Sequence, residues 1–294
     1  MKIKLKEYIS ILFELGKVRI TSFVAVSTAI GYIMASGRID MGLILPTFGV
    51  FFLAISSSAL NHYQEGDIDA LMDRTKNRPI PSGRMSSKNV LYISILFFIL
   101  SSIVIWLSSN EMAMFIGWVA FIWYNIIYTP LKRKYAFAVV PGSVIGALPP
   151  IIGWVAAGGS PFEPQVLALA MFFFIWQVPH FWLLLLVYGK DYEQAGLPTL
   201  TQIFDNSQLS RITFIWIVGL STSCFLIPLF GVSNSIVTYS ILFSLGIWLI
   251  YSTGKMLFVY YNQTSFRQAF MQINIYVLAV VVILSIDKLL LTDF

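Results

Sequence analysis

The stretch MGLILPTFGVFFLAISSSALNHYQEGDIDALMDRTKNRPIPSG, residues 41–83, contains the two features on which the fold class depends. Residues 41–62 carry no Asp, Glu, Lys or Arg, and a helix needs roughly 20 apolar residues to cross the hydrocarbon core of a bilayer. Seven charged residues follow directly: Glu65, Asp67, Asp69, Asp73, Arg74, Lys76 and Arg78. The stretch therefore predicts a membrane-spanning helix that ends in a polar site.

The composition of the whole chain supports a membrane protein. Of its 294 residues, 57% are apolar and 11% are charged, whereas soluble domains carry about 25% charged residues. So few charges exclude a soluble enzyme and a disordered chain. The single cysteine, Cys224, lies in an apolar run and cannot form an internal disulfide, which excludes a secreted disulfide scaffold.

Nine stretches are long and apolar enough to cross a bilayer, so we predict an all-α membrane protein with nine transmembrane helices. The fifth is interrupted by Gly and Pro, which neighbouring helices or a cavity can accommodate. The predicted spans are residues 20–36, 41–62, 89–109, 111–130, 137–157, 164–187, 211–231, 235–259 and 268–290.

The lysines and arginines predict the orientation. With the N-terminus in the cytoplasm, 17 of the 19 Lys and Arg residues fall in cytoplasmic segments, and only Arg38 and Lys288 fall outside. The net charge of +5 is therefore a topology signal, and no nucleic-acid partner is expected. We predict a cytoplasmic or interfacial segment at residues 1–19, followed by a single nine-helix domain at residues 20–294.

The acids after the second span have helical spacing. Asp67 is out of step with them unless Gly66 loosens the helix. A stripe of like charges repels itself, and Mg²⁺, which prefers oxygen ligands and is usually held together with substrate phosphates, would reverse that repulsion. The alternative is a solvated cytoplasmic loop of mixed charge. The residues at four-residue intervals, which share one face if the helix continues, are Asn61, Glu65, Asp69 and Asp73.

A second acidic site follows the sixth span, at Asp191 and Glu193. Two acidic helix ends on one face of the membrane could hold two metals that bridge one diphosphate. Arginine forks and lysines suit the phosphate oxygens. The basic residues on this predicted face include Arg74, Lys76, Arg78, Lys132, Arg133 and Lys134.

The sixth span also contains Gln177 and His180 around Pro179. Polar residues inside a membrane are costly and are candidates for function. One interpretation is that His180 or Gln177 bonds the backbone carbonyl that Pro179 frees, and the other is contact with a polar or metal-bearing ligand. His62, beside Asn61, either serves the first acidic site or lies in the interface.

These motifs resemble those of the UbiA-type intramembrane prenyltransferases, and within them the heme O synthase (protoheme IX farnesyltransferase) branch. The superfamily features are Asn61, Glu65 and Asp69 together with RTKNRPIPSG at 74–83. The branch-specific blocks are DIDALMDRTKNRP at 67–79, YTPLKR at 128–133, GALPPIIGW at 146–154, PHFW at 179–182 and KDYEQAGLP at 190–198.

The resemblance implies a nine-helix UbiA-type bundle in the bacterial cytoplasmic membrane, with an active site near the cytoplasmic face. It implies that magnesium helps farnesyl diphosphate to ionise, and that the farnesyl group and water add to a vinyl group of protoheme, giving heme O. Heme is then a substrate and not a resident cofactor, and heme A synthase or terminal oxidase subunits are partners.

The resemblance also implies roles for individual residues. The catalytic residues are Asn61, Glu65, Asp69 and Asp191, and the same four with Asp67 hold the metal. The implied substrate-binding residues are Arg74, Arg78, Lys132 and Arg133 for the diphosphate, His180 for the heme side, and Tyr192.

Two positions depart from the superfamily pattern. Glu65 stands where Asp is usual, and Ala195 stands where the second acidic motif often has Asp. The loss at 195 favours heme over quinone precursors and weakens the two-metal account. The alternatives that stay open are a prenyltransferase acting on an aromatic quinone precursor, a membrane transporter and a non-catalytic oxidase assembly factor.

Overall fold

The computed structural model of the protein describes residues 5–232, 235–255 and 263–291. Nine helical segments in these residues are long and apolar enough to cross a membrane, one for each predicted span. The nine-helix prediction is therefore confirmed for the described part of the chain. The segments are Val18–Ser36, Met41–Gln64, Ser87–Ser108, Glu111–Leu131, Ala136–Ala156, Pro164–Gln194, Asn206–Val232, Ile236–Lys255 and Thr264–Leu290.

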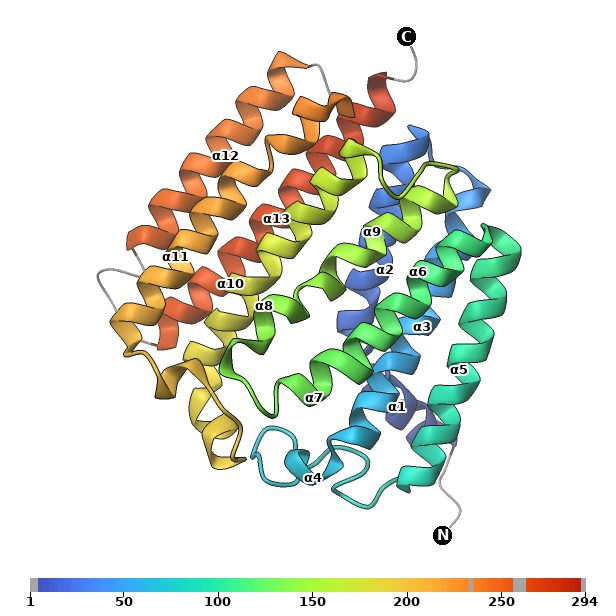
Figure 1. Ribbon diagram of the computed structural model, residues 1–294, viewed down its shortest axis with the longest axis vertical. Helices are drawn as coiled ribbons and strands as arrows, with labels where there is room; N and C mark the ends of the chain where they lie inside the picture. The colour runs from blue at the N-terminus through green and yellow to red at the C-terminus, as the bar shows by residue number, and fades with distance from the viewer. Residues whose placement is uncertain (1–4, 233–234, 256–262, 292–294) are drawn as a thin grey trace.

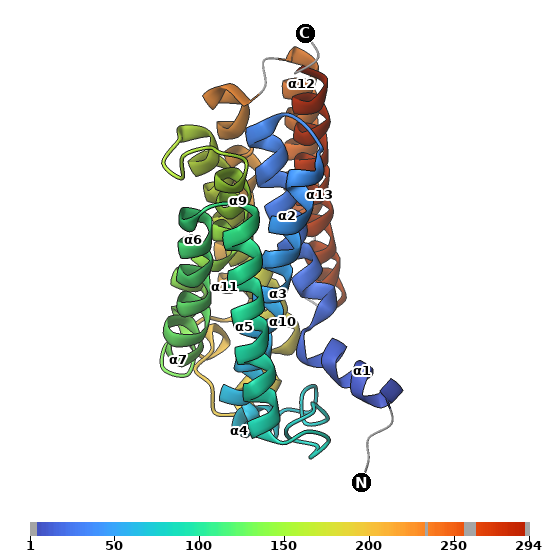
Figure 2. The ribbon, with the colours of Figure 1, turned by 90° about the vertical axis from the view of Figure 1, so that its right-hand side faces the viewer.

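The spanning segments form one elongated bundle (Figures 1 and 2). Figure 1 shows helices α10 (Pro164–Gln194), α11 (Asn206–Ser223), α12 (Ile236–Lys255) and α13 (Gln263–Leu291) along one side. Helices α3 (Ile44–Gln64), α5 (Ser87–Ser108) and α6 (Glu111–Ile122) lie along the other side. Between them lie α2 (Val18–Ser36) and α9 (Val144–Ala156), which pack extensively on each other.

The N-terminal helix α1 (Leu5–Leu15) projects from one end of the bundle (Figure 2). Its apolar residues Ile11 and Leu15 are buried in a small core with Ala59 of α3, while Leu5 and Phe13 are exposed. An apolar face with flanking charges suits a helix that lies in the membrane interface. Glu14 fixes α1 to the loop before α5 through an ion pair with Arg84, at 2.8 Å between Oε2 and Nη2.

Irregular backbone lies near one end of the bundle in three places, at the ends of the second and fourth spans and at the start of the fifth, whereas the seventh span has a separate π-helical turn at Pro228–Val232. Helix α3 stops at Glu65, which has φ −113° and ψ 10°, and a single turn, α4 (Gly66–Asp69), follows. The fourth span ends in a π-helical turn at Trp123–Tyr128 and then α7 (Thr129–Leu131). The fifth begins with a 3₁₀ turn at Ala136–Ala138 and α8 (Val139–Gly142).

Side chains donate hydrogen bonds to two backbone carbonyls of the π-helical turn. Gln64 Nε2 donates to the carbonyl oxygen of Asn125 at 2.9 Å, and the Thr129 hydroxyl donates to the carbonyl oxygen of Tyr124 at 2.9 Å. Irregular backbone is tolerated at membrane depth only where such partners exist or where a cavity is lined. These turns therefore connect the end of α3 to the fourth span through the polar groups of both.

Helices α2 and α9 approach each other so closely that their backbones meet. A Cβ atom on Gly153 would overlap the carbonyl oxygen of Thr28, and a Cβ on Gly31 would overlap that of Pro150. Small residues permit close packing of membrane helices, where van der Waals contact is a main source of association energy.

We predict that Gly153→Ala destabilises the protein by about 1–3 kcal/mol, because the added methyl forces α2 away from α9. The free energy of unfolding in detergent or mixed micelles measures this change. Gly219→Ala in α11 is the matched control, since its Cβ would meet only Ile175 at an ordinary 3.8 Å. Equal stabilities of the two variants would contradict the close packing.

Candidate active site

A cavity of about 410 Å³ opens between α2, α3, the π-helical turn, α9 and α10. Most of its wall is apolar, including Val50, Leu53 and Phe121. Its polar end is lined by Lys17, Asn61, Glu65, Asp69, Arg74, Arg78 and Lys132. The rise of α3 from Val50 to Asn61 is about 16 Å at 1.5 Å per residue, so the cavity suits an elongated apolar molecule with an anionic end.

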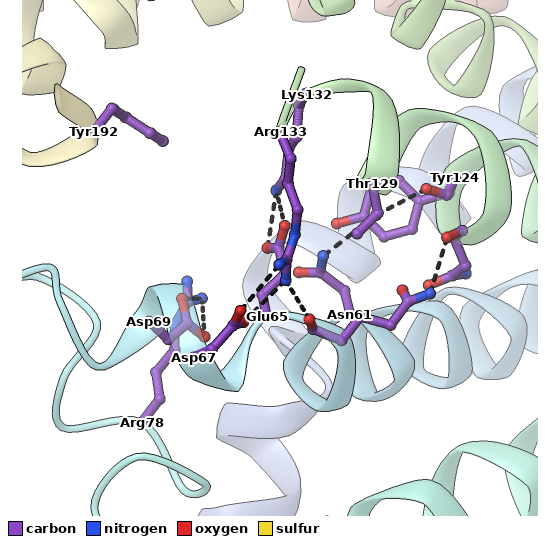
Figure 3. Close-up of polar contacts among 12 residues, drawn as sticks. Asn61, Glu65, Asp67, Asp69, Arg78, Tyr124, Thr129, Lys132, Arg133 and Tyr192 are labelled. Atoms are coloured by element: carbon purple, nitrogen blue, oxygen red, sulfur yellow. Dashed lines mark hydrogen bonds and ion pairs between the residues drawn. The ribbon is translucent and has the colours of Figure 1, made fainter. Parts of the chain in front are cut away.

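The predicted ligands Asn61, Glu65 and Asp69 lie together at this polar end, with side chains that are almost fully buried. Glu65 pairs with Lys132 at 2.6 Å between Oε1 and Nζ. Asp69 receives two hydrogen bonds from Nη1 of Arg78, at 2.7 and 2.8 Å. Figure 3 shows both pairs beside Asn61. The turn at α4 keeps Asp69 near Glu65 although the helix has been interrupted.

The other two acids of the motif lie outside the cavity. The continuous stripe through Asp73 is wrong, because the helical part ends at Asp69, and exposed Asp73 pairs with Lys76 at 2.6 Å. Asp67 is also exposed and receives two hydrogen bonds from Arg133, at 3.0 and 2.9 Å. These bonds lower the pKa of the Asp67 carboxyl below its usual value. Neither Asp67 nor Arg133 lines the cavity.

Arg74 connects the loop after α4 to the end of α10. Its Nη2 donates to the Tyr192 hydroxyl at 3.2 Å, and its guanidinium carbon lies 5.6 and 5.8 Å from the ring centroids of Tyr188 and Tyr192. Tyr192 lines the cavity, opposite the ion pairs (Figure 3), so two predicted substrate-binding residues meet here.

The second acidic site does not reach the cavity wall. Asp191 is half-buried and is absent from the cavity lining. Glu193 accepts hydrogen bonds from the hydroxyls of Thr199 and Thr201, at 3.2 and 2.6 Å, and so closes the loop after α10. The metal role of Asp191 stays a prediction.

Lys17 belongs to the polar end of the cavity, although the sequence presents it only as one of many positive residues near the N-terminus. Its Nζ donates to Asn61 Oδ1 at 3.1 Å. Among the described residues it is the only non-glycine with positive φ, 45°, a conformation that costs roughly 1–2 kcal/mol. Burial and the nearby cations Arg78 and Lys132 lower the pKa of its ammonium to about 7. The bend between α1 and α2 thus directs a cation at Asn61.

The two histidines lie outside the cavity lining. His180 Nδ1 is 3.0 Å from Asn274 Oδ1 on α13, and the amide nitrogen of Asn274 donates to the carbonyl oxygen of Phe270. With that amide orientation, His180 donates from Nδ1 and its Nε2 carries the lone pair. His62 is buried, and neither ring nitrogen has a hydrogen-bond partner in the described structure.

Gln177 lines the apolar part of the cavity, one turn from His180. Its amide occupies space that a side chain at position 146 would fill, because a Cβ on Gly146 would overlap Gln177 Oε1. The hydroxyl-bearing rings of Tyr124 and Tyr128 also line the cavity, with centroids 5.9 Å apart. The sequence predicts no role for either tyrosine, although Tyr128 begins the block YTPLKR, and the π-helical turn positions both.

The donor set at the polar end fits magnesium. Asn61, Glu65 and Asp69 supply hard oxygen atoms, and Mg²⁺ favours one or two carboxylates together with phosphate oxygens. The cations beside them, Arg78 and Lys132, suit phosphate oxygens. The site can therefore bind a metal and an anionic group side by side at the mouth of an apolar chamber.

Comparison with known proteins also indicates a prenyltransferase. The chain is 30% identical to a protoheme IX farnesyltransferase of Oleidesulfovibrio alaskensis over 94% of this chain and 95% of that one. It is 40% identical to a protoheme IX farnesyltransferase of Geobacter sulfurreducens over 62% of this chain and 67% of that one.

Solved structures share the fold. A digeranylgeranylglyceryl phosphate synthase superposes with a TM-score of 0.77 at 18% identity, covering 96% of this chain and 98% of that one. A UbiA homologue from Archaeoglobus fulgidus, bound to GPP and Mg²⁺, superposes with a TM-score of 0.65 at 14% identity, covering 92% of this chain and 99% of that one. Residues 24–278 match the UbiA prenyltransferase family as a whole, and the chain belongs to that family.

Proposed function

We propose that this protein transfers the farnesyl group of farnesyl diphosphate to a vinyl group of protoheme, with addition of water, to give heme O and diphosphate. The observation that carries the proposal is the cavity, which joins a buried cluster of ion-paired oxygen donors and cations to an apolar chamber of about 410 Å³. The curated relatives named protoheme IX farnesyltransferase support protoheme as the acceptor.

The reaction breaks the bond between farnesyl C1 and the diphosphate oxygen and forms a bond between C1 and a vinyl carbon. Water adds its oxygen to the other vinyl carbon and releases one proton. Asn61, Glu65 and Asp69 would hold magnesium, which, when bound, stabilises the negative charge of the departing diphosphate. Lys132 and Arg78 stand beside these ligands and bind and orient the diphosphate.

The tyrosines of the π-helical turn suit the allylic cation. Tyr124 and Tyr128 line the cavity next to the polar end, and Lys132 Nζ already lies 5.7 Å from the Tyr128 ring centroid. Aromatic faces attract positive charge, more strongly where water is excluded. The apolar wall excludes water from the farnesyl chain, so that the cation meets the acceptor before it meets solvent.

We predict that expression in a host lacking heme O yields heme O, detected by extraction and mass spectrometry. Glu65→Gln and Asp69→Asn should each lower the rate of farnesyl transfer at least about a hundredfold, because each removes a metal ligand and leaves Lys132 or Arg78 without its carboxylate. Asp73→Asn is the control, since Asp73 is exposed.

Three results would contradict this proposal. Full farnesyl transfer by both Glu65→Gln and Asp69→Asn would remove the metal site. A prenylated 4-hydroxybenzoate without any heme O would identify the aromatic quinone precursor as acceptor. An absence of substrate-dependent diphosphate release would favour a transporter or an assembly factor.

We further propose that His180 serves the heme side. Its Nε2 is the lone-pair nitrogen, and Asn274 orients the ring through Nδ1, an arrangement common in metal-binding histidines. Trp176 and Phe270 flank the ring, with centroids 4.8 and 4.6 Å away. The rival interpretation is a hydrogen bond that only joins α10 to α13.

For His180→Ala, we predict that heme affinity falls at least about tenfold while the affinity for farnesyl diphosphate is unchanged. Titration of heme, followed by its Soret absorbance in detergent, measures the first. His62→Ala is the control, because it removes the other histidine of the chain, which lies in α3 and is not held by Asn274. An unchanged Soret titration for His180→Ala would show that His180 has a structural role and does not bind heme.

We also propose that the N-terminus and the polar end of the cavity face the cytoplasm of a bacterial cell, with heme O passed to a heme A synthase or a terminal oxidase. The basic residues support this orientation, because the loop after α4 and the loop after α7 both lie at the α1 end of the bundle (Figure 1).

Alkaline phosphatase fused to the N-terminus should be inactive, whereas a fusion at the C-terminus, after the ninth span found in the described residues, should be active. The reverse pattern would overturn the orientation.

A further inference from the structure

The cavity carries more positive than negative side chains. Four cationic residues line it, but only Glu65 and Asp69 provide negative charge. These two carboxylates are already paired, with Lys132 and Arg78. The lining cations without a carboxylate partner in the described structure are Arg74, bonded to the Tyr192 hydroxyl, and Lys17, bonded to the amide oxygen of Asn61.

A second metal would need carboxylates on the cavity wall that faces the Asn61–Asp69 cluster, and Arg74 occupies that wall. It lies against Tyr188 and Tyr192 at the end of α10. The acids of that helix end are not available there, because Glu193 is bonded to two threonine hydroxyls and Asp191 does not line the cavity. The wall facing the Asn61–Asp69 cluster thus presents a guanidinium in place of metal ligands.

Charge balance also favours one metal ion over two. A prenyl diphosphate carries roughly three negative charges near neutral pH, since the last ionisation of a phosphate has a pKa of about 6. With the excess of two positive side chains, one Mg²⁺ leaves the filled site about one charge from neutral, whereas two leave it about three charges positive. A neutral Lys17 would lower both totals by one and keep their order. Uncompensated charge is expensive in a chamber with mostly apolar walls.

We propose that this protein binds its prenyl diphosphate with a single magnesium ion, held at Asn61, Glu65 and Asp69, and that Arg74 and Lys17 take the place of a second ion. Both cations contact the diphosphate oxygens and neutralise the charge that develops on them as the C1–O bond breaks. This inference rests on the prenyl diphosphate of the proposed function and is independent of the acceptor.

Metal stoichiometry tests the inference without any turnover. The purified protein in detergent is saturated with farnesyl thiodiphosphate, an unreactive analogue, and titrated with Mn²⁺, whose free concentration is read by EPR. One Mn²⁺ bound per analogue is expected. Two Mn²⁺ per analogue, with the broadened signal of a coupled pair, would overturn the proposal.

Two variants test the substitute cations. Arg74→Gln and Lys17→Asn should each weaken binding of the analogue at least about tenfold, while the count stays at one Mn²⁺. Asn tolerates positive φ, so Lys17→Asn removes the charge without straining the bend between α1 and α2. Exposed Lys88→Gln and Arg19→Gln are the matched controls.

Analogue affinities of both variants equal to those of their controls would show that these cations do not replace a metal. Asp191→Asn should leave the Mn²⁺ count unchanged, and a fall in that count would restore Asp191 as a ligand. Because no heme is present in these measurements, an acceptor other than protoheme would leave every result intact. The product analysis that tests the proposed function gives a result that is independent of these binding measurements.

Discussion

The structure depends on the requirement that a charge buried in a membrane bundle must have a partner. Glu65 and Asp69 are almost fully buried at the end of the second span, and each is held by a cation from a different segment. Lys132 comes from the loop after the fourth span, and Arg78 comes from the loop after α4. Each ion pair therefore fixes a loop over the mouth of the cavity.

The end of α3 also contacts the interruption of the fourth span. Glu65 ends α3, and this allows Gln64 to reach the carbonyl oxygen of Asn125 in the π-helical turn. The π-helical turn directs Tyr124 and Tyr128 into the cavity. Irregular turns of this kind occur often at functional sites, because they re-aim side chains that a regular helix would bury elsewhere. The backbone breaks, the buried charges and the cavity are therefore parts of one arrangement.

The sequence predicted the nine spans because each is a long apolar run, and hydropathy reports burial in lipid directly. It also brought Asn61, Glu65 and Asp69 together correctly, since their four-residue spacing survives the single turn of α4. It extended the stripe to Asp73 because nothing in the spacing indicates where a helix stops. The break at Glu65 coincides with contacts to the fourth span and the loop after it, which lie far along the chain.

Other features of the site depend on the direction in which each side chain points, which the local sequence does not encode. Lys17 is interpreted as a topology signal, and neither its positive φ nor the contact of its ammonium with Asn61 can be read from the sequence. Asp191 and Tyr192 are neighbours, but a helix rotates by about 100° per residue, so only Tyr192 faces the cavity. His180 likewise sits one turn from Gln177 and yet contacts α13. The residue types can be read from the sequence, whereas packing decides which side chains face the cavity.

The cost of the ion pairs explains why they matter for function more than for stability. Removing two charges from water is expensive, and a buried pair is often no more stable than the apolar residues that could replace it. The pairs at Glu65 and Asp69 therefore add little that leucines could not supply. Their value lies in the exchange they permit. A carboxylate that releases its cation can hold a metal, and the released cation can hold a phosphate, so the same four side chains can serve both arrangements.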